Sequence, residues 1–147
     1  MLPTDERWAR RPLFAFTLAT DLGFVAYWLV TAAHLLPDAW LFKDYRDPVL
    51  NDWNWSFMAI DLLVSATGLS AAWLWKRRDA RAQPLALMSL TLTSTSGLMA
   101  LAFWTLRGDF EPGWWAPNLF LLVWPLCFVP RFLVTTGPRA PTAAPRS

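Results

Sequence analysis

Apolar residues gather in four long stretches along the chain, separated by shorter polar stretches. Each stretch reaches the roughly 20 residues that an α-helix needs to cross the hydrocarbon core of a bilayer. They cover residues 13–36, 54–75, 84–106 and 114–134. Pro37, Pro84 and the pair Pro112-Gly113 stand at their boundaries, where helices begin or end. Because the connections are short, the pattern predicts an all-α, up-and-down bundle of four transmembrane helices.

This pattern predicts one integral membrane domain over residues 1–135, with its longest connection at residues 37–53. The tail at residues 136–147 is rich in Pro, Ala and small polar residues, which predicts a disordered cytoplasmic segment. A basic N-terminus before an apolar run is also typical of a signal peptide. Here the apolar run is about twice the usual length and contains Asp21, so we expect it to remain as the first span.

Lys and Arg residues are distributed unevenly over the two sides of the predicted bundle. If the N-terminus is inside, ten of the 13 lie on the cytoplasmic flanks and three on the outer flanks. Cytoplasmic flanks of membrane proteins hold the excess of Lys and Arg. We therefore expect a multi-pass protein of the cell membrane with its N- and C-termini in the cytoplasm.

Composition narrows the chemistry further. The chain is 55% hydrophobic, contains 11 Trp and 10 Phe, and has a mean hydropathy of +0.29, which is typical of membrane proteins. One cysteine, Cys127, excludes a disulfide within the chain, and together with the single His34 it cannot complete a zinc site. We predict no cofactor, no metal site, no catalytic residues and no nucleic-acid partner, with the lipid bilayer as the immediate environment.

Two aspartates interrupt the apolar spans, Asp21 in the first and Asp61 in the second. An aspartate at the centre of an inserted helix costs about 2.5 to 3.5 kcal/mol, so its presence requires a reason. With a rise of about 1.5 Å per residue, both lie near mid-bilayer and are offset from each other by about 8 to 10 Å. The third span places five hydroxyls in the same layer: Thr91, Thr93, Ser94, Thr95 and Ser96. The most polar residues of three spans therefore overlap in depth.

Helical spacing directs these polar residues into the bundle. Asp61, Ser65 and Gly68 recur at i, i+4 and i+7, which forms a stripe of polar and small residues that lipid cannot satisfy. Two deep tryptophans join this layer, and Pro125 predicts a kink beside one of them. We predict a ligand-binding pocket at mid-membrane formed by Asp21, Asp61, Ser65, Thr91, Ser94, Thr95, Trp28 and Trp124. A purely structural role for the aspartates, as residues that register the helices, stays open.

The connection at residues 37–53 combines charged and aromatic side chains. We expect its central part to form a lid on the outer surface, built from Trp40, Phe42, Lys43, Asp44, Tyr45 and Arg46. The alternative is a solvated linker with ion pairs that are each worth little. The second outer loop carries Arg107, Asp109 and Glu111, which predicts a salt bridge between the two loops above the bundle.

Five segments of the chain, taken together and in this order, carry a resemblance to a known family. They are LFKDY, WNWSF, DLLVSATGL, FWTLRGDF and WWAPNLFL. With them the chain resembles the YvaD-like family of small bacterial membrane proteins from about residue 14 to residue 133. The resemblance implies a four-span protein of the bacterial inner membrane, and it implies no activity.

Four functions remain open for such a bundle. We favour a binding bundle that holds a lipophilic or cationic small molecule, because a carboxylate at depth is a suitable counter-ion for an amine in an apolar cavity. The first alternative is a small proton-linked transporter that works as a homo-oligomer. The others are a membrane enzyme that uses Asp21 and Asp61 as acid and base, and a structural subunit of a larger membrane complex. Enzymatic activity is less favoured, because the depth offset of the two carboxyl groups is large for one reacting centre.

Overall fold

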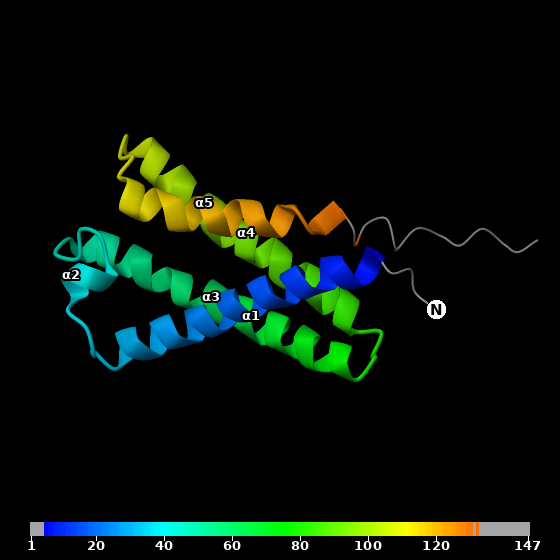
Figure 1. Cartoon of the computed structure of the whole chain (residues 1–147). Coiled ribbons are helices and arrows are strands. Elements are labelled where there is room, and N and C mark those ends of the chain that lie inside the picture. The colour runs from blue at the N-terminus through cyan, green and yellow to red at the C-terminus, as the bar shows by residue number, and fades with distance from the viewer. Residues whose placement is uncertain (1–4, 131, 133–147) are drawn as a thin grey trace, which may run out of the picture.

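The computed structural model describes residues 5–130 and 132, and these residues contain five α-helices and no strand (Figure 1). The helices are α1 (Asp5–Ala32), α2 (Asp38–Leu41), α3 (Pro48–Lys76), α4 (Ala82–Leu106) and α5 (Pro112–Leu126). The four longer helices run in alternating directions and are inclined to one another, and α1 crosses α3 (Figure 1). The all-α class that the sequence predicts is therefore confirmed. The predicted tail at residues 136–147 lies outside the described residues.

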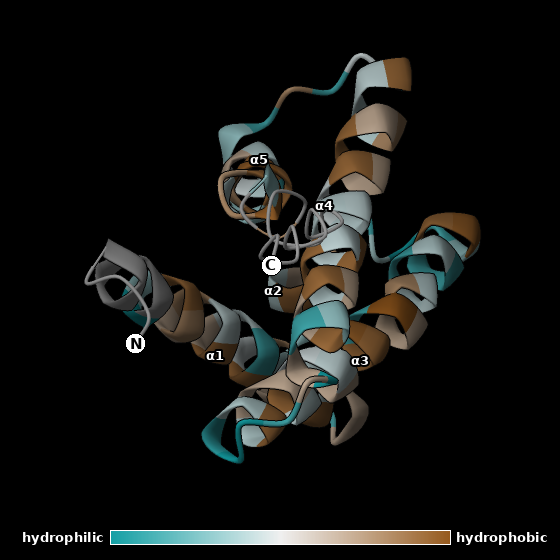
Figure 2. Cartoon of the chain, turned by 90° about the vertical axis from the view of Figure 1, so that its right-hand side faces the viewer, coloured by the Kyte–Doolittle hydropathy of each residue, from teal (hydrophilic) through white to brown (hydrophobic). Residues whose placement is uncertain are grey.

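Three of these helices are long and apolar enough to cross a membrane by length and composition. They contribute the segments Arg11–Ala32, Pro48–Lys76 and Ala82–Leu106. Hydrophobic residues lie on the outer as well as the inner faces of the helices (Figure 2), which is expected of helices that contact lipid on one side and protein on the other. These features are those of a membrane protein.

The last predicted span differs from the continuous helix that the apolar run suggested. α5 has 15 residues and ends at Leu126, and a turn at Cys127 and Phe128 follows it. The physical reason is Pro125, which has no N–H to donate to the preceding turn and whose ring crowds that turn. At about 1.5 Å per residue, α5 alone reaches about 22 Å, less than the thickness of the hydrocarbon core.

The second span begins earlier than predicted. α3 starts at Pro48 rather than near residue 54, because the Asp47 carboxylate accepts hydrogen bonds from the backbone N–H groups of Val49 (2.9 Å) and Leu50 (3.3 Å). Pro48 at the first helical position needs no N–H partner, which makes the same start favourable. The connection therefore covers residues 33–47, not 37–53, and contains the short helix α2.

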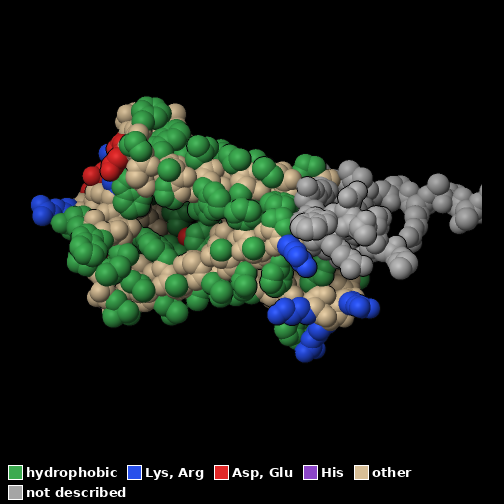
Figure 3. Space-filling model, viewed as in Figure 1, with side chains coloured by type: hydrophobic (Ala, Val, Ile, Leu, Met, Phe, Trp, Pro, Cys, Tyr) green, Lys and Arg blue, Asp and Glu red, His purple; other side chains and the backbone are tan. Residues whose placement is uncertain are grey.

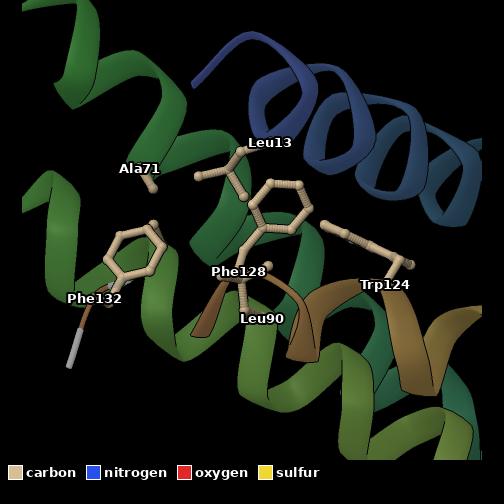
Figure 4. Close-up of a cluster of buried hydrophobic side chains, with 7 residues drawn as sticks. Leu13, Ala71, Leu90, Trp124, Phe128 and Phe132 are labelled. Carbon is tan, nitrogen blue, oxygen red and sulfur yellow. The ribbon is translucent and has the colours of Figure 1, made fainter. Parts of the chain in front are cut away.

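α3 and α4 form the centre of the arrangement, with α1 packed against α3 and α5 packed against α4. α4 and α5 approach so closely at Gly97 that a Cβ atom there would lie 2.5 Å from the Asn118 carbonyl oxygen. Between α1 and α5, contact is made by aromatic rings, among them the stacked pair Phe16 and Trp124 with centroids 5.5 Å apart. α1, α3 and α4 also share a cluster of buried apolar side chains with the end of the α5 segment (Figure 4).

The two ends of the molecule differ in charge (Figure 3). We call one end the basic end, because between residues 11 and 130 its Lys and Arg residues are Arg11, Lys76, Arg77, Arg78 and Arg81, and its acidic residue is Asp79. The opposite end, the acidic end, carries Asp38, Asp44, Asp47, Asp52, Asp109 and Glu111 beside Lys43, Arg46 and Arg107. Hydrophobic side chains cover most of the visible surface between the two ends (Figure 3).

Candidate functional site

The Asp61 carboxylate lies where three helices meet. Asp61 is buried on α3, and its Oδ2 accepts a hydrogen bond from the indole N–H of Trp28 on α1 at 3.0 Å. Its Oδ1 accepts a second hydrogen bond from the hydroxyl of Ser96 on α4, also at 3.0 Å. No cationic side chain among the described residues pairs with this carboxylate. Asp61 is therefore a fixed hydrogen-bond acceptor without a counter-ion.

Asp61 and Ser96 line a cavity of about 300 Å³ towards the acidic end. Eight of its 15 lining residues are aromatic, and these eight come from the four longer helices and from the segment that follows α2. Polar contributions besides Asp61 and Ser96 come from Asn54 and Asn118. Figure 3 shows a hollow between α5 and the helices below it, with an acidic side chain at its bottom. The cavity is thus mostly aromatic and has one carboxylate in its wall.

The segment that contains α2 covers this cavity. Leu41 and Phe42 are buried and line it, and the Leu41 carbonyl accepts a hydrogen bond of 2.8 Å from the Tyr27 hydroxyl on α1. The Phe42 ring packs against both Trp28 and Trp55, with centroid distances of 6.4 and 5.7 Å. The cover is therefore packed against α1 and α3, two of the helices that carry the Asp61 hydrogen-bond network.

Lys43 connects the cover to the loop between α4 and α5. Its ammonium lies 2.6 Å from the Asp109 carboxylate and 2.7 Å from the Glu111 carboxylate, which confirms the predicted salt bridge between the loops. It also lies 5.1 Å from the ring centroid of Trp104, whose face attracts cations. The hydrogen bond from Lys43 holds the pKa of Asp109 below its usual value, although limited desolvation of the carboxyl opposes this effect.

The remaining residues of the predicted lid do not act as one unit. Tyr45 is half-buried beside Trp28 and Phe42, whereas the Trp40 side chain is 75% exposed and Asp44 and Arg46 are exposed. Asp44 has a φ of 52°, in the left-handed region that aspartate tolerates better than most residues. The sequence therefore predicted the position of the cover, while the division into covering and solvated residues came from the structure.

Asp21 occupies a different place from Asp61. The Ser65 hydroxyl donates to the backbone carbonyl of Asp21 at 2.9 Å and to that of Asp61 at 3.0 Å, so one residue of α3 connects both backbones. The Asp21 side chain is only 1% exposed, and its Oδ2 has no hydrogen-bond partner among the described residues. The Asp21 carboxyl group lies against Gly68, which stands seven residues after Asp61 on α3, about 10 Å along the helix axis. The two carboxyl groups do not share one cavity.

The other predicted pocket residues lie apart from Asp61. Thr91 is exposed, and the hydroxyls of Thr91 and Thr95 donate to carbonyls of their own helix. The Ser94 hydroxyl donates to the Leu122 carbonyl on α5 at 3.1 Å. Trp124 is buried in the cluster of Figure 4, towards the basic end, and does not line the cavity beside Asp61.

Sequence reasoning missed Ser96 as a site residue, although it belongs to the hydroxyl run. Ser89, Thr93 and Ser96 are buried and recur at i, i+4 and i+7, the same spacing that identified the stripe of α3. The helical spacing of these three residues places them on a different face of α4 from Thr91 and Thr95. It could therefore have predicted which hydroxyls point into the bundle. The asparagines Asn54 and Asn118 of the cavity wall carried no comparable signal, because each stands in an aromatic segment near a span end.

Together, the apolar helices and the buried polar layer define a helical membrane protein with a covered cavity towards one end. The chain belongs to a family of unknown function (DUF5360), whose model matches residues 13–139. Over 114 residues it is 46% identical to the uncharacterized protein YvaD of Bacillus subtilis (strain 168), a match that covers 78% of this chain and 86% of that protein. No solved structure matches the chain. The resemblance that the sequence motifs indicated is thereby confirmed, and the relatives supply no activity.

Proposed function

We propose that this protein binds a small lipophilic cation inside the membrane, with Asp61 as its counter-ion. One observation carries the proposal: a buried carboxylate without a cationic partner among the described residues lines a cavity of about 300 Å³ with mostly aromatic walls. Pockets of this size that combine apolar walls with few polar groups are suited to small molecules. An ionisable residue in a membrane span that faces such a pocket is a functional-site hypothesis by default.

The walls of the cavity favour a cation over a neutral or anionic ligand. Asp61 supplies the negative charge, and Trp28 and Ser96 hold its two oxygens in fixed positions. Aromatic faces attract cations by about 0.5 to 2 kcal/mol each, more strongly when water is excluded. An anion in the same cavity would meet a carboxylate of its own sign.

The position of the cavity favours a ligand that first dissolves in the bilayer. Its walls include Phe24 and Tyr27 of α1 and Trp114 and Asn118 of α5, the two helices that are bridged by aromatic rings rather than closely packed. The α2 segment, held by Lys43, covers the aqueous side. Entry between α1 and α5 therefore selects amphiphiles with an apolar tail and a cationic head.

The proposal includes a membrane topology of four crossings with both termini in the cytoplasm. Supporting it, between residues 11 and 130 the basic end carries five Lys or Arg and one Asp, and cytoplasmic flanks hold such an excess. The fourth crossing combines α5 with the residues after its end, because Phe128 and Phe132 still pack against the cluster that α1, α3 and α4 share. Single cysteines at the exposed positions Ala80 and Arg107, labelled from each side of the membrane, test this orientation.

Tryptophan fluorescence tests the binding site, because Trp28, Trp53, Trp104 and Trp114 line the cavity. The protein in neutral detergent is titrated with decyltrimethylammonium and, in parallel, with decanol, which has the same tail and no charge. For Asp61→Asn we expect the Kd of the ammonium to rise at least about tenfold, equivalent to about 1.4 kcal/mol, with decanol unaffected. Asp21→Asn serves as the matched control, since Asp21 does not line this cavity. Equal ammonium affinity in wild type and Asp61→Asn would refute the proposal.

Native mass spectrometry of the detergent-released protein separates this function from its main alternative. A retained small cation on the wild type that is absent from Asp61→Asn supports binding by Asp61 and gives the mass of the ligand. The same spectra report stoichiometry. A homo-oligomer together with pH-driven release of the cation from sealed proteoliposomes would instead favour proton-linked transport.

A further inference from the structure

A second cavity, of about 380 Å³, lies towards the basic end and is separate from the one beside Asp61. It is lined by Arg11 and Thr17 of α1, Gly68 and Ala72 of α3 and Ala86 of α4, among others. None of its lining residues lines the first cavity. The described part of the molecule therefore has a cavity towards each end.

Asp21 stands at the inner limit of this second cavity. Thr17, one turn before Asp21 on α1, lines the cavity, and so does Gly68. Asp21 Oδ2 lies against Gly68 so closely that a Cβ atom on Gly68 would overlap it. The same Oδ2 is buried and has no hydrogen-bond partner among the described residues. Gly68, which lies against this unsatisfied carboxyl oxygen, is thus also part of the wall of a cavity that extends to Arg11.

We propose that Asp21 is a proton-binding site that is reached from the basic end through this cavity. A carboxylate oxygen buried without a donor or a cation is strongly unfavourable, and a bound proton removes its charge. Asp61 has two donors and faces the cavity of the acidic end. The two carboxyl groups therefore exchange with opposite sides of the molecule, Asp21 with protons and Asp61 with its own ligand.

A proton fits this position better than a metal ion. No group of three or more His, Cys, Asp or Glu side chains among the described residues is arranged to hold a metal. Contact with Gly68 on one side leaves no space there for a coordination shell, whereas a proton needs only one oxygen. The Asp21 carboxyl group lies against Gly68, and the Asp21 backbone carbonyl accepts a hydrogen bond from Ser65, and neither of these residues is charged. The charged residue that lines the same cavity is Arg11, ten residues earlier on α1.

Infrared spectroscopy of the whole protein in lipid films tests the proposal, because a protonated carboxyl group has a carbonyl band that is separate from the amide bands. We expect a band in the wild type that disappears on titration to alkaline pH and is missing in Asp21→Asn. Asp61→Asn should retain it, so the result does not depend on whether Asp61 binds a cation. A spectrum in which the Asp21→Asn substitution removes no such band at any pH would overturn the proposal.

Exchange of the same proton with D₂O tests the route. Ala72→Phe fills the cavity without replacing a residue in contact with Asp21, and we expect it to slow the shift of the carboxyl band after transfer to D₂O. Ala66→Phe is the matched control, because Ala66 lies on an exposed face of α3 and lines neither cavity. Thr17→Leu narrows the cavity from α1 and gives a second, independent variant. Exchange as fast in Ala72→Phe and Thr17→Leu as in Ala66→Phe would refute access through this cavity.

Discussion

Asp61 and Asp21 are both buried carboxyl residues of helices that can span the membrane, but their surroundings differ. Asp61 accepts hydrogen bonds from Trp28 and Ser96, whereas Asp21 Oδ2 has no partner among the described residues. Ser65 donates to the backbone carbonyls of both, so the difference lies in the side chains. Burial alone thus does not define what an intramembrane acid does. The donors around it decide whether it serves as a fixed negative group or depends on a proton.

Replacement of each aspartate by alanine should give the largest difference between the two positions. Asp61→Ala leaves the Trp28 N–H and the Ser96 hydroxyl without their acceptor, and each such loss costs about 1 to 3 kcal/mol. We expect a total destabilisation of about 3 kcal/mol for Asp61→Ala. Asp21→Ala removes an unsatisfied group, so the change should stay within about 1 kcal/mol or be stabilising. Thermal unfolding in detergent, followed by circular dichroism, measures both, and equal losses would contradict the comparison.

The depth of the polar layer could be predicted from the sequence, whereas its hydrogen-bond partners could not. Helical spacing was sufficient to place Asp61 and Ser65 on one inward stripe. The run from Thr91 to Ser96 marked the right level on α4, but every direction around that helix carries a hydroxyl, so the run did not indicate which one faces Asp61. The partner of Asp61 on α4 depends on how α4 is rotated against α3, which is a property of packing.

The helices themselves were predictable to within a few residues where hydrophobicity ends abruptly. Leu106, the last residue of the third predicted span, is also the last residue of α4. Errors arose where local backbone chemistry overrides hydrophobicity. α3 begins at Pro48, after the N-cap Asp47, inside a charged stretch that the hydropathy pattern assigned to a loop. α5 ends next to Pro125, inside an apolar run. Capping and proline rules, applied before the hydropathy pattern, would have found the first of these, and the kink predicted at Pro125 already indicated the second.

Gly68→Ala should destabilise the protein by displacing the Asp21 carboxyl group. A Cβ atom at Gly68 would overlap Asp21 Oδ2 and lie 2.8 Å from Ser89 Oγ, so the carboxyl group must move. Overpacking of this kind costs about 1 to 3 kcal/mol, and we expect about 2 kcal/mol here, measured by the same thermal unfolding. Gly23→Ala is the matched control on α1, because nothing lies within 4 Å of a Cβ atom there.

A double variant shows whether the loss in Gly68→Ala comes from the carboxyl group. When Asp21→Ala is combined with Gly68→Ala, the overlapping oxygen is gone, and the cost of Gly68→Ala should fall by about half or more, a coupling of about 1 kcal/mol. Strictly additive losses would show that Gly68 matters through backbone packing of α1 against α3 instead. The position of Asp21 against α3 would then need another explanation.

Trp28→Phe separates the hydrogen bond of Asp61 from the packing around it. The variant retains an aromatic ring between Tyr27 and Phe42 and removes only the N–H that Asp61 Oδ2 accepts, together with part of the ring. We expect a destabilisation of about 1 to 2 kcal/mol. Trp40→Phe, at a side chain that is 75% exposed, should have almost no effect in the same unfolding assay. If Trp28→Phe is also neutral, Ser96 alone holds the carboxylate.

Lys43→Met should lower the stability of the folded protein less than Asp61→Ala, Gly68→Ala or Trp28→Phe. The partners of Lys43 lie on the exposed rim of the acidic end, where ion pairs contribute little. Partial burial alone would lower the Lys43 pKa, but hydrogen bonds to Asp109 and Glu111 outweigh it and raise the pKa above 10.5. The hydrogen bond from Lys43 in turn lowers the Asp109 pKa. The attachment of the cover to the loop between α4 and α5 should therefore depend on pH.

The sign of the pH dependence follows from these two pKa shifts. A lowered pKa of Asp109 stabilises the folded state above the unfolded value of 3.8, and this contribution is lost as the pH falls through the lower folded value. A raised pKa of Lys43 stabilises below 10.5 and is lost as the pH rises through the higher folded value. The difference in Tm between wild type and Lys43→Met should therefore stay constant from about pH 5 to about pH 9 and shrink in stronger acid or base. Arg46 donates a hydrogen bond to the Tyr45 hydroxyl, so the Tm difference of Arg46→Met should not depend on pH in this way. The same pH profile in Arg46→Met would show that the effect comes from net charge and not from the ion pairs of Lys43.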